Sequence, residues 1–514
     1  MIPTRPRQPG FAAQASGAMF WNVVLIPFQA VVALAASAVV ARRLTIDQYA
    51  VYGLAMAALT SLLLWSDLGL MPMVSRYAPL LRAHGAAVLR AFLWKVSAAR
   101  LAALAVAVLG FAAASRLPLV RRMLPFEGPG LLLLLAALAA QGVARLHEYF
   151  LSGLLERRSV GLIRIAVGLV HPLLVIGAVT AGYGVNGILA AVCAASLLDA
   201  SMFAWAALRR TRSVGPPGGP APPRPRDLRA EAARFAAVSY LEKLASHVNS
   251  AGFILFFVAV LGTRAEVAAF AVAGEFASRV IAALSIPFSG LTLPLFATVE
   301  AQRPAETGTA ARLYLTVMLL FCVPAAALLS VLGPSLVALV YSERYLDAAP
   351  ILRAFVPFLF FEYAIYSALL APLLTRGRYR DVLLSKLPML AGPLAVLAVL
   401  PRWGTVGAAL VYGLARLASA MLLLRSGQRE LGFRFPLAFA GKVVLASVAA
   451  TVAATLVQPY VEGWPGLLVT GAPAVATFLL VYRLLGGMDP VDRALVAQGA
   501  QGAPAVERLV TYLL

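Results

Sequence analysis

Long apolar stretches follow one another along almost the whole chain, separated by short polar segments. A helix that crosses the hydrocarbon core of a membrane needs about 20 mostly apolar residues, and each of these stretches meets that length. The pattern therefore predicts an all-α polytopic membrane protein with about 14 transmembrane helices. They are expected at residues 17–41, 48–74, 88–114, 130–155, 160–182, 184–208, 232–262, 265–297, 309–341, 348–374, 380–400, 404–425, 438–460 and 464–486.

One polar segment, residues 209–231, is much longer than the others and rich in arginine, proline and glycine. Proline fixes φ and removes a backbone donor, and glycine leaves the chain loose, so we expect a solvated, semi-extended linker. It divides the chain into an N-terminal six-helix bundle (1–208), a C-terminal six-helix bundle (232–425), an extra helix pair (426–486) and a tail (487–514). The tail opens with Asp489-Pro490, a cap residue followed by proline, which predicts a short surface helix.

Composition narrows the class of protein. Of the 514 residues, 61% are apolar and only 13% are charged, and the mean hydropathy is +0.86. Soluble globular domains hold about 25% charged residues, so this chain does not fit that class. The net charge of +21 would suggest nucleic acid in a soluble protein. Here the arginines stand beside helix ends, where they set orientation and can hold anionic lipid headgroups, and no nucleic-acid partner is expected.

Two further features of the sequence have ordinary explanations. Cys193 and Cys322 lie far apart inside apolar stretches, without metal-ligand spacing, and are expected to be packing residues. The first apolar run, 17–41, follows two arginines as in a signal peptide. It is too long for one and lacks a convincing cleavage site, so we interpret it as a retained helix.

The distribution of lysine and arginine predicts the orientation, because these residues are enriched in cytoplasmic loops. If the N-terminus is cytoplasmic, the cytoplasmic loops carry Arg76, Arg82, Arg90, Arg157, Arg158, the linker cluster, Arg376, Arg378, Arg380, Arg425, Arg429 and Arg434. The opposite side carries fewer, mainly Arg42, Arg43, Arg116, Arg121 and Arg122. The bias favours both termini in the cytoplasm, and the cluster at 116–122 argues against it.

Short segments recur after the linker at a nearly constant offset. Gly184-Val-Asn-Gly187 returns as Gly404-Thr-Val-Gly407, and Glu148-Tyr149 returns as Glu362-Tyr363. Tyr49-Ala-Val-Tyr52-Gly is echoed by Val267-Ala-Ala-Phe270-Ala. Three matches in the same order predict two copies of a six-helix unit. Transporters built this way place the substrate between the two units, near the middle of the membrane.

At the second predicted helix the chain resembles a known family. Arg43-Leu-Thr-Ile-Asp-Gln-Tyr49-Ala-Val-Tyr52-Gly53, leading to Asp67-Leu-Gly69-Leu, is similar to the start of polysaccharide-biosynthesis membrane proteins, the oligosaccharide-lipid flippases of O-antigen type. Their superfamily also contains multidrug/toxin extruders and lipid II flippases. The two Gly-x-x-Gly segments and the Asp489 tail are similar too, so the resemblance spans nearly the whole chain.

The resemblance implies a carrier in the bacterial inner membrane, not an enzyme. It would move a polyprenyl-diphosphate-linked oligosaccharide from the cytoplasmic to the outer leaflet for lipopolysaccharide or other surface polysaccharide. Helices one, two, seven and eight would line a cavity that opens alternately to each side. A polysaccharide polymerase and a chain-length regulator are the protein partners it suggests. The extra helix pair departs from a twelve-helix core and resembles the fourteen-helix lipid II flippases.

Ionisable side chains inside predicted helices are candidate site residues, since each costs roughly 2.5–3.5 kcal/mol to place at a helix centre. Glu275 and Arg279 are four residues apart, and therefore neighbours on one helix face. They form either an internal salt bridge or a pair that a phosphate separates, because a guanidinium can hold phosphate through two hydrogen bonds.

The seventh predicted helix carries a polar stripe of Ser239, Lys243, Ser246 and Ser250, with Glu242, His247 and Asn249 at its margins. Glu242 and Lys243 either lie in the headgroup zone or face the cavity; His247 and Asn249 are deeper and are expected to face the cavity. Asp67 either responds to protonation, because burial raises the pKa of a carboxylate, or makes a structural bond to the backbone before Gly69.

Other polar residues have weaker claims. Glu148 and its repeat partner Glu362 are expected to hold their bundles together rather than to transport. His171, beside Pro172, is expected to be a satisfied polar group in a kinked helix, and Asp199 and Arg416 carry no specific prediction.

No glycine-rich phosphate loop and no His/Cys cluster is present, so neither ATP nor a metal cofactor is expected; H+ or Na+ are the candidate coupling ions. A drug/cation antiporter would need an anionic cavity, whereas Lys243, His247 and Arg279 favour an anionic substrate. A membrane glycosyltransferase or polymerase would need a large external loop, and the longest loop is the basic linker.

Overall fold

Helices are the only regular elements in the part of the chain that the computed structural model describes. It describes residues 31–82, 84–124, 128–154, 156–212, 225–285, 303–457 and 463–489, with the single residues 292, 296, 299, 300 and 493. Eleven of the described helices are long and apolar enough to cross a membrane, or twelve if one bent pair counts as a span. The prediction of an all-α, multi-pass membrane protein is confirmed, and the figure of about 14 spans is approximate.

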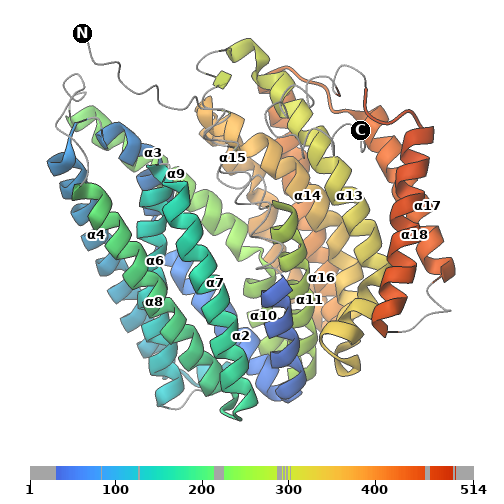
Figure 1. Ribbon diagram of the computed structural model, residues 1–514, viewed down its shortest axis with the longest axis horizontal. Coiled ribbons are helices and arrows are strands. Elements are labelled where there is room, and N and C mark those ends of the chain that lie inside the picture. The colour runs from blue at the N-terminus through green and yellow to red at the C-terminus, as the bar shows by residue number, and fades with distance from the viewer. Residues whose placement is uncertain are drawn as a thin grey trace, which may run out of the picture.

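The helices before the linker form the N-terminal group, drawn in blue to green at the left of Figure 1. The chain enters it through a helix over residues 31–43. The other helices are α2 (Ile46–Trp65), α3 (Leu70–Arg82), α4 (Ala86–Ala114), the short α5 (Pro118–Met123), α6 (Pro129–Gly153), α7 (Arg157–Thr180) and α8 (Gly184–Arg212). Within this group α6 contacts α8, α3 and α4 most extensively, and α7 lies against α8.

The helices after the linker form the C-terminal group, which fills the centre and right of Figure 1. They are α9 (Pro225–Val248), α10 (Ala251–Leu261), α11 (Arg264–Ser285), α13 (Thr307–Val340), α14 (Ala348–Thr375), α15 (Tyr379–Ser385), α16 (Leu387–Leu431), α17 (Leu437–Val457) and α18 (Gly463–Leu484), with 3-10 turns at Pro304–Glu306 and Glu343–Tyr345. The extra pair α17–α18 packs against α13 at the edge of the group. We call the end where α8 stops and α9 starts the linker end, and the opposite end the far end.

Three predicted segments differ from the helices that the structure describes. The helix expected at 48–74 is interrupted at Ser66–Gly69, where Leu68 and Gly69 adopt φ of 51° and 72°. The helix expected at 232–262 bends by 42° between α9 and α10, where Ser250 accepts a hydrogen bond from Phe253 N and caps α10. The ends of the expected linker are helical, since α8 continues to Arg212 and α9 starts at Pro225. The linker centre, the start of the first predicted helix, most of 286–297 and the tail helix lie outside the described residues.

The repeated Gly-x-x-Gly segments have the same backbone geometry. Gly184 and Gly404 adopt φ of 58° and 62°, and at Gly404 this changes the helical course inside α16. Side chains in matching places crowd the second glycine of each segment: a Cβ at Gly187 would lie 2.4 Å from Tyr183 Cβ, and one at Gly407 would lie 2.5 Å from Trp403 Cβ. Each segment is a sharp reversal that only glycine at both positions allows.

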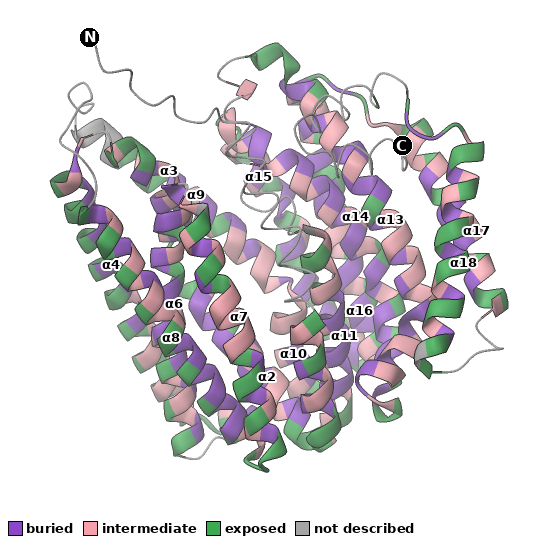
Figure 2. Cartoon of the chain, in the orientation of Figure 1, coloured by how far each residue is buried: buried purple, intermediate pink, exposed green. Residues whose placement is uncertain are grey.

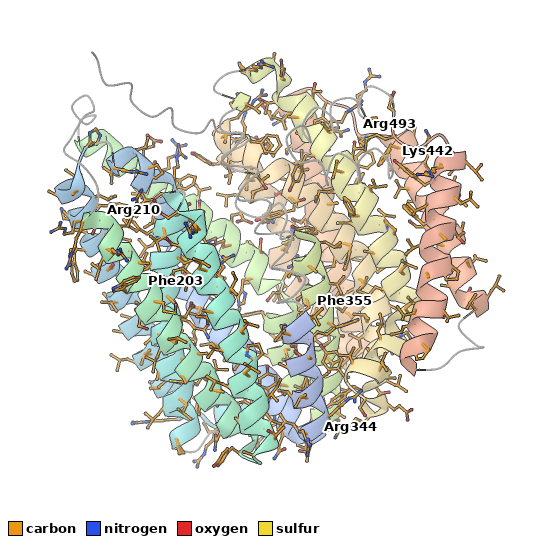
Figure 3. The ribbon with its side chains drawn as sticks, viewed as in Figure 1. Phe203, Arg210, Arg344, Phe355, Lys442 and Arg493 are labelled. Atoms are coloured by element: carbon orange, nitrogen blue, oxygen red, sulfur yellow. The ribbon has the colours of Figure 1, made fainter. Side chains whose placement is uncertain are left out.

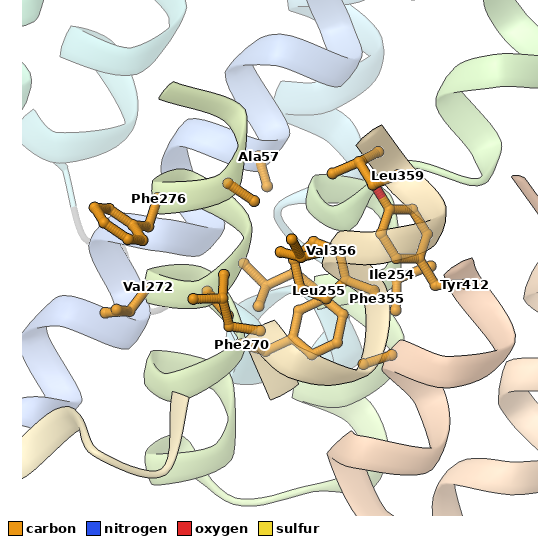
Figure 4. Packing of buried hydrophobic residues seen from close by; sticks show 14 of the residues in the cluster. Ala57, Ile254, Leu255, Phe270, Val272, Phe276, Phe355, Val356, Leu359 and Tyr412 are labelled. Carbon is orange, nitrogen blue, oxygen red and sulfur yellow. The ribbon is translucent and has the colours of Figure 1, made fainter. Parts of the chain in front are cut away.

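Burial separates the inside of the protein from its lipid-facing surface. Buried side chains of α2, α10, α11, α14 and α16 pack together at the centre, with Ala57, Leu255, Phe276 and Phe355 among them (Figures 2 and 4). Exposed residues follow α4, α17 and α18 at the two sides, and many of these are large and apolar. Apolar side chains facing outward at membrane depth are solvated by lipid, which fits a multi-pass membrane protein.

Candidate functional site

All the predicted site residues except Asn249 lie at the contact between the two groups, which we call the seam. It is made by α2 and α3 on one side and by α9, α10 and α11 on the other. Small residues let the backbones approach closely: a Cβ at Gly53 would lie 2.9 Å from Ala271 Cβ, and one at Gly252 would lie 3.7 Å from Ala57 Cβ. Small residues at the seam therefore bring the backbones of the two groups close together.

Arg279 and Glu275 are paired at the seam, as their spacing predicts. Both Nε and one terminal nitrogen of Arg279 donate to Glu275 Oε1, at 3.0 and 2.7 Å. The N-terminal group adds two donors that the sequence did not reveal: Ser37 Oγ to Oε1 at 2.8 Å and Tyr49 OH to Oε2 at 2.9 Å. Glu275 is thus shared between the two groups, and the Arg279 side chain keeps 35% of its surface exposed.

Lys243 and Asp67 form an ion pair that crosses the seam, at 3.2 Å. Asp67 lies in the α2–α3 break, is only 2% exposed, and accepts a hydrogen bond from Met71 N at 3.2 Å. The backbone bond of Asp67 thus comes from Met71, after Gly69, and not from the turn before Gly69, and Asp67 has an ionic partner as well. Lys243 also approaches the Tyr149 ring, with its nitrogen 5.8 Å from the ring centre.

His247 continues the same line of contacts along α9. Its Nε2 lies 2.8 Å from Ser61 Oγ of α2. About two turns nearer the linker end, Tyr240 OH donates to Trp65 O at 3.1 Å. Beyond them, Arg76 of α3 pairs with Glu231 of α9 at 3.0 Å. Polar groups of α9 therefore meet α2 and α3 at intervals from the middle of the seam to the linker end.

Asn249 lies apart from these residues. It is completely buried inside the C-terminal group, where its Nδ2 donates to Tyr412 O at 3.3 Å and its Oδ1 has no hydrogen-bond partner. Gly392 packs directly against that oxygen, since a Cβ there would lie 2.4 Å away. The structure thus places Asn249 among α9, α10 and α16 rather than with Lys243 and Arg279.

Glu242, next to Lys243 in sequence, points into the C-terminal group. Its carboxylate accepts from Tyr366 OH and Ser246 Oγ and pairs with Lys386 at 3.4 Å. Lys386 is 2% exposed and its ammonium lies 4.2 Å from the centre of the Tyr366 ring. Lys386 was not among the predicted site residues.

Arg100 is a second buried cation that was not among the predicted site residues. It is fully buried in the N-terminal group and donates to Ser66 Oγ, Leu63 O and Gly142 O at 3.2–3.4 Å. It therefore holds the end of α2, just before the break that carries Asp67. The signal that could have found it was its position as a lone charge in the middle of the apolar stretch 88–114.

The repeated glutamates pair within their own groups. Glu362 of α14 binds Arg416 of α16 at 2.9 Å, and both are largely buried. Glu148 of α6 binds the more exposed Arg164 of α7. These contacts fit the predicted role of holding helices together. His171 of α7 is exposed rather than enclosed in a kink, and lies within electrostatic range of Arg279.

Arginines also join the two groups at the far end, where Figure 3 labels Arg344. Arg344, just after α13, donates to Arg42 O at 2.5 Å and Leu44 O at 3.1 Å, and Arg42 in turn donates to Leu339 O. Tyr345 OH donates to Ala41 O at 3.3 Å. Burial raises the pKa of Tyr345 to about 12, so the hydroxyl keeps its proton. We call this set of contacts the first clamp.

The second clamp joins the start of α11 to α5 at the far end. Arg264, at the start of α11, donates to Arg122 O at 2.5 Å and Met123 O at 3.1 Å. The two donors, Arg42 of the first clamp and Arg264 of the second, are 222 residues apart. Their acceptors, Leu339 and Arg122, are 217 residues apart. These spacings match those of the sequence echoes, so the two clamps are repeat equivalents.

Within the described residues, no group of three or more His, Cys, Asp or Glu side chains has the arrangement of a metal site. The two cysteines, Cys193 and Cys322, are buried and unpaired by disulfide. The polar chemistry of the described seam is that of hydroxyl groups and ion pairs, in which the carboxylates of Glu275, Asp67 and Glu231 each hold a partly exposed cation.

The fold is shared with solved transporters. A lipid II flippase MurJ in an inward closed conformation has 14% sequence identity and a TM-score of 0.64, covering 92% of this chain and 99% of its own. A multidrug resistance MATE family transporter of the MOP superfamily, in an inward-facing conformation, has 15% identity and a TM-score of 0.58, covering 80% and 98%. A MOP superfamily transporter from Pyrococcus furiosus has 14% identity and a TM-score of 0.57, covering 82% and 95%.

No curated protein matches the chain. The family model of polysaccharide biosynthesis proteins matches residues 39–350, from the first described helix into α14. This is more than half of the chain and includes the whole seam. The chain therefore belongs to the polysaccharide biosynthesis protein family.

Proposed function

We propose that the protein carries a polyprenyl-diphosphate-linked oligosaccharide across the bacterial inner membrane, from the cytoplasmic to the outer leaflet, by alternating access. Membership of the polysaccharide biosynthesis family and the fold shared with flippases and transporters support a carrier. The substrate class rests on the cations of the seam. A polymerase and a chain-length regulator would act on the delivered oligosaccharide.

The observation that carries the proposal is the Arg279–Glu275 pair at the seam. A diphosphate carries about two negative charges and cannot leave water for an apolar cavity unless cations replace its hydration. Arg279 is held by a single carboxylate oxygen through two of its nitrogens, and its side chain is 35% exposed. An incoming phosphate can therefore take over the exposed edge of the guanidinium through two parallel hydrogen bonds.

Lys243 supplies a second exchangeable cation. It is 29% exposed, while its partner Asp67 is 2% exposed and is also held by the backbone. A phosphate that draws Lys243 away leaves Asp67 with its bond from Met71 N. Substrate binding would thus loosen the Lys243–Asp67 pair, which joins the two groups, and the Arg279–Glu275 pair within α11. This links loading to the movement of one group against the other. If protons drive the cycle, Asp67 and Glu275 are the seam carboxylates on which they act.

We place the linker end and both termini in the cytoplasm, because that end carries most of the lysines and arginines. Several arginines of the far end are occupied within the protein, since Arg42, Arg264 and Arg344 donate to backbone carbonyls in the two clamps. With Cys193 and Cys322 both buried, a single cysteine introduced at Gly218 can be labelled selectively. It should react only after the membrane is opened; reaction from outside intact cells reverses the orientation.

The proposal is tested by flipping of defined lipid-linked sugars in proteoliposomes. Arg279→Ala should abolish flipping with the protein folded, because the diphosphate loses its cation. Arg279→Lys should keep partial activity, since an ammonium keeps the charge and loses the two-pronged grip. Glu275→Gln should bind substrate at least as well and cycle abnormally.

The matched control is Arg353→Ala, which removes an exposed arginine of α14 that donates to Ser330 O away from the seam. It should flip normally. Lipid II and cationic dyes are offered in parallel vesicles. Normal flipping by Arg279→Ala at equal protein amounts, or transport of dyes without any lipid-linked sugar, contradicts the proposal; preference for lipid II replaces the oligosaccharide by that substrate.

A further inference from the structure

The carboxylate of Glu275 has more donors than a simple ion pair requires. Oε1 accepts from Ser37 Oγ and from two nitrogens of Arg279, and Oε2 accepts from Tyr49 OH. Ser37 and Tyr49 belong to the N-terminal group, whereas Glu275 and Arg279 belong to α11 of the C-terminal group. Two hydroxyl groups on one side of the seam therefore compete with a guanidinium on the other side for one negative charge.

The two hydroxyls are tied to the closure of the far end. Ser37 lies in the helix that ends at residue 43, one to two turns before the first clamp, and Tyr49 lies in the first turn of α2 just after it. The Tyr49 ring is fully buried and packs on the Tyr345 ring, with the centres 5.2 Å apart. Tyr345 donates to Ala41 O within that clamp. When the groups separate at the far end, Tyr345 leaves with α13 and Glu275 leaves with α11, so Tyr49 OH loses its acceptor and Ser37 Oγ is left with Ala33 O of its own helix, at 3.1 Å.

Losing these donors changes how tightly Glu275 holds Arg279. A carboxylate that accepts hydrogen bonds from hydroxyl groups has part of its charge satisfied and attracts a neighbouring cation less. Without them, inside an apolar surrounding, the remaining partner must satisfy the whole charge, because an unpaired buried carboxylate is costly. Arg279 is then held more firmly and is less available to a phosphate.

On this basis, and resting on the proposed function, we infer that Ser37 and Tyr49 are positioning residues that set the affinity of Arg279 for the diphosphate according to the state of the far end. With the far end closed, the hydroxyls share Glu275, so that Arg279 is held less firmly and its exposed edge can bind substrate arriving from the linker end. With the far end open, Glu275 reclaims Arg279 and the diphosphate is released there. Glu275 would thereby favour binding of the diphosphate from the linker end and its release at the far end.

The test is the affinity of the full-length protein, in nanodiscs, for farnesyl diphosphate as a short prenyl-diphosphate probe, measured by calorimetry. Tyr49→Phe and Ser37→Ala each remove one hydroxyl and should each raise Kd by about tenfold, since hydrogen bonds to charged groups are of that size. Tyr52→Phe is the matched control, because it removes a hydroxyl one turn along α2 that is not among the donors to Glu275, and its Kd should stay within about twofold. Thermal unfolding verifies that each variant is folded.

The decisive arm combines Tyr49→Phe with Glu275→Gln. A neutral amide does not hold Arg279, so in this background Tyr49→Phe should leave Kd unchanged. An equal loss in both backgrounds means that Tyr49 acts only on packing and overturns the inference. Wild-type affinity of both Tyr49→Phe and Ser37→Ala, with binding abolished in Arg279→Ala, overturns the inference alone. No binding by the wild-type protein, or unchanged binding by Arg279→Ala, overturns the proposed function and the inference with it.

Discussion

At the scale of single residues, Arg100 and Lys386 are the lysine or arginine side chains with the lowest exposed fractions in the described chain, 0% and 2%. Neither stood out in the sequence for the role it has. Hydropathy identifies a charge in an apolar stretch, as for Arg100, and cannot say which helices bring its partners. Lys386 contacts Glu242 of α9, more than a hundred residues earlier, and Tyr366 of α14, about twenty residues earlier. Only the packing of those helices brings these side chains together.

Lys386→Met should destabilise the protein strongly. It leaves the carboxylate of Glu242 buried without a cation, and breaking a buried ion pair in this way costs about 3–5 kcal/mol. The expected result is a clearly lower unfolding temperature in detergent, largely recovered by adding Glu242→Gln, which removes the unpaired charge. Lys95→Met, at an exposed lysine of α4, is the control and should change little. Equal unfolding temperatures for Lys386→Met and wild type would show that the pair contributes no net stability.

At the seam, only the contacts within one helix could be predicted from the sequence. Glu275 and Arg279 were paired from their spacing on one helix, because residues four apart are neighbours whatever the tertiary fold. Ser37 and Tyr49 were not, since their contacts with Glu275 span 238 and 226 residues. Asn249 shows the opposite error: its neighbours on α9 face the seam, and the bend at Ser250 places it in the interior of the C-terminal group.

At the scale of elements, most helix positions follow from apolar length alone. The stretches expected at 88–114, 130–155 and 348–374 appear as α4, α6 and α14 with ends within two residues. The break between α2 and α3 escaped this criterion because apolar residues continue through it. Its cause is local: Gly69 takes a left-handed conformation and lies directly against the backbone of α9. Hydropathy shows which segments avoid water, whereas this break is set by the contact of Gly69 with a neighbouring helix.

Gly69→Ala should disrupt the α2–α3 break. A left-handed backbone costs an L-residue about 1–2 kcal/mol, and the new Cβ would lie 2.0 Å from Ala236 O, so α9 must also move away. Since Asp67 and Lys243 lie next to this contact, we expect loss of flipping together with reduced stability. Gly441→Ala on α17, where a Cβ meets nothing within 4 Å, is the control and should be neutral or slightly stabilising. Wild-type flipping by Gly69→Ala would mean that the break can reshape without affecting the seam.

At the scale of the whole molecule, the repeat predicted from three short echoes reappears in contacts that those echoes do not include. Gly184 and Gly404 make equivalent reversals, and the two clamps connect equivalent loops. The sequence could suggest a duplicated architecture because local motifs survive in both copies. It could not suggest the clamps, since their acceptors are backbone carbonyls, which no residue type marks.

Removing a clamp should shift the protein toward an open far end. Spin labels at Leu117 and Glu343, exposed residues of the two groups at that end, report the separation by double electron–electron resonance. Arg264→Ala and Arg344→Ala should each increase the long-distance population several-fold, because each removes a side chain that makes two bonds of its clamp, and the double variant should increase it further. Arg402→Ala, whose side chain bonds only to Ala398 O of its own helix among the described contacts, is the control. An unchanged distribution in the double variant would mean that apolar packing alone closes this end.

The chemistry of the clamps has one more consequence, for acid tolerance. Each clamp joins a guanidinium to backbone carbonyls, and neither group changes its charge between about pH 3 and pH 11. The Tyr345 hydroxyl, with a pKa of about 12, also stays neutral over that range. A closure made from arginine and carboxylate would weaken as the medium acidified and its carboxylates were protonated; the described contacts of the two clamps include no carboxylate. The barrier at the far end should therefore remain shut in acidic surroundings, which leaves the carboxylates of the seam as the place where acidity reaches the carrier.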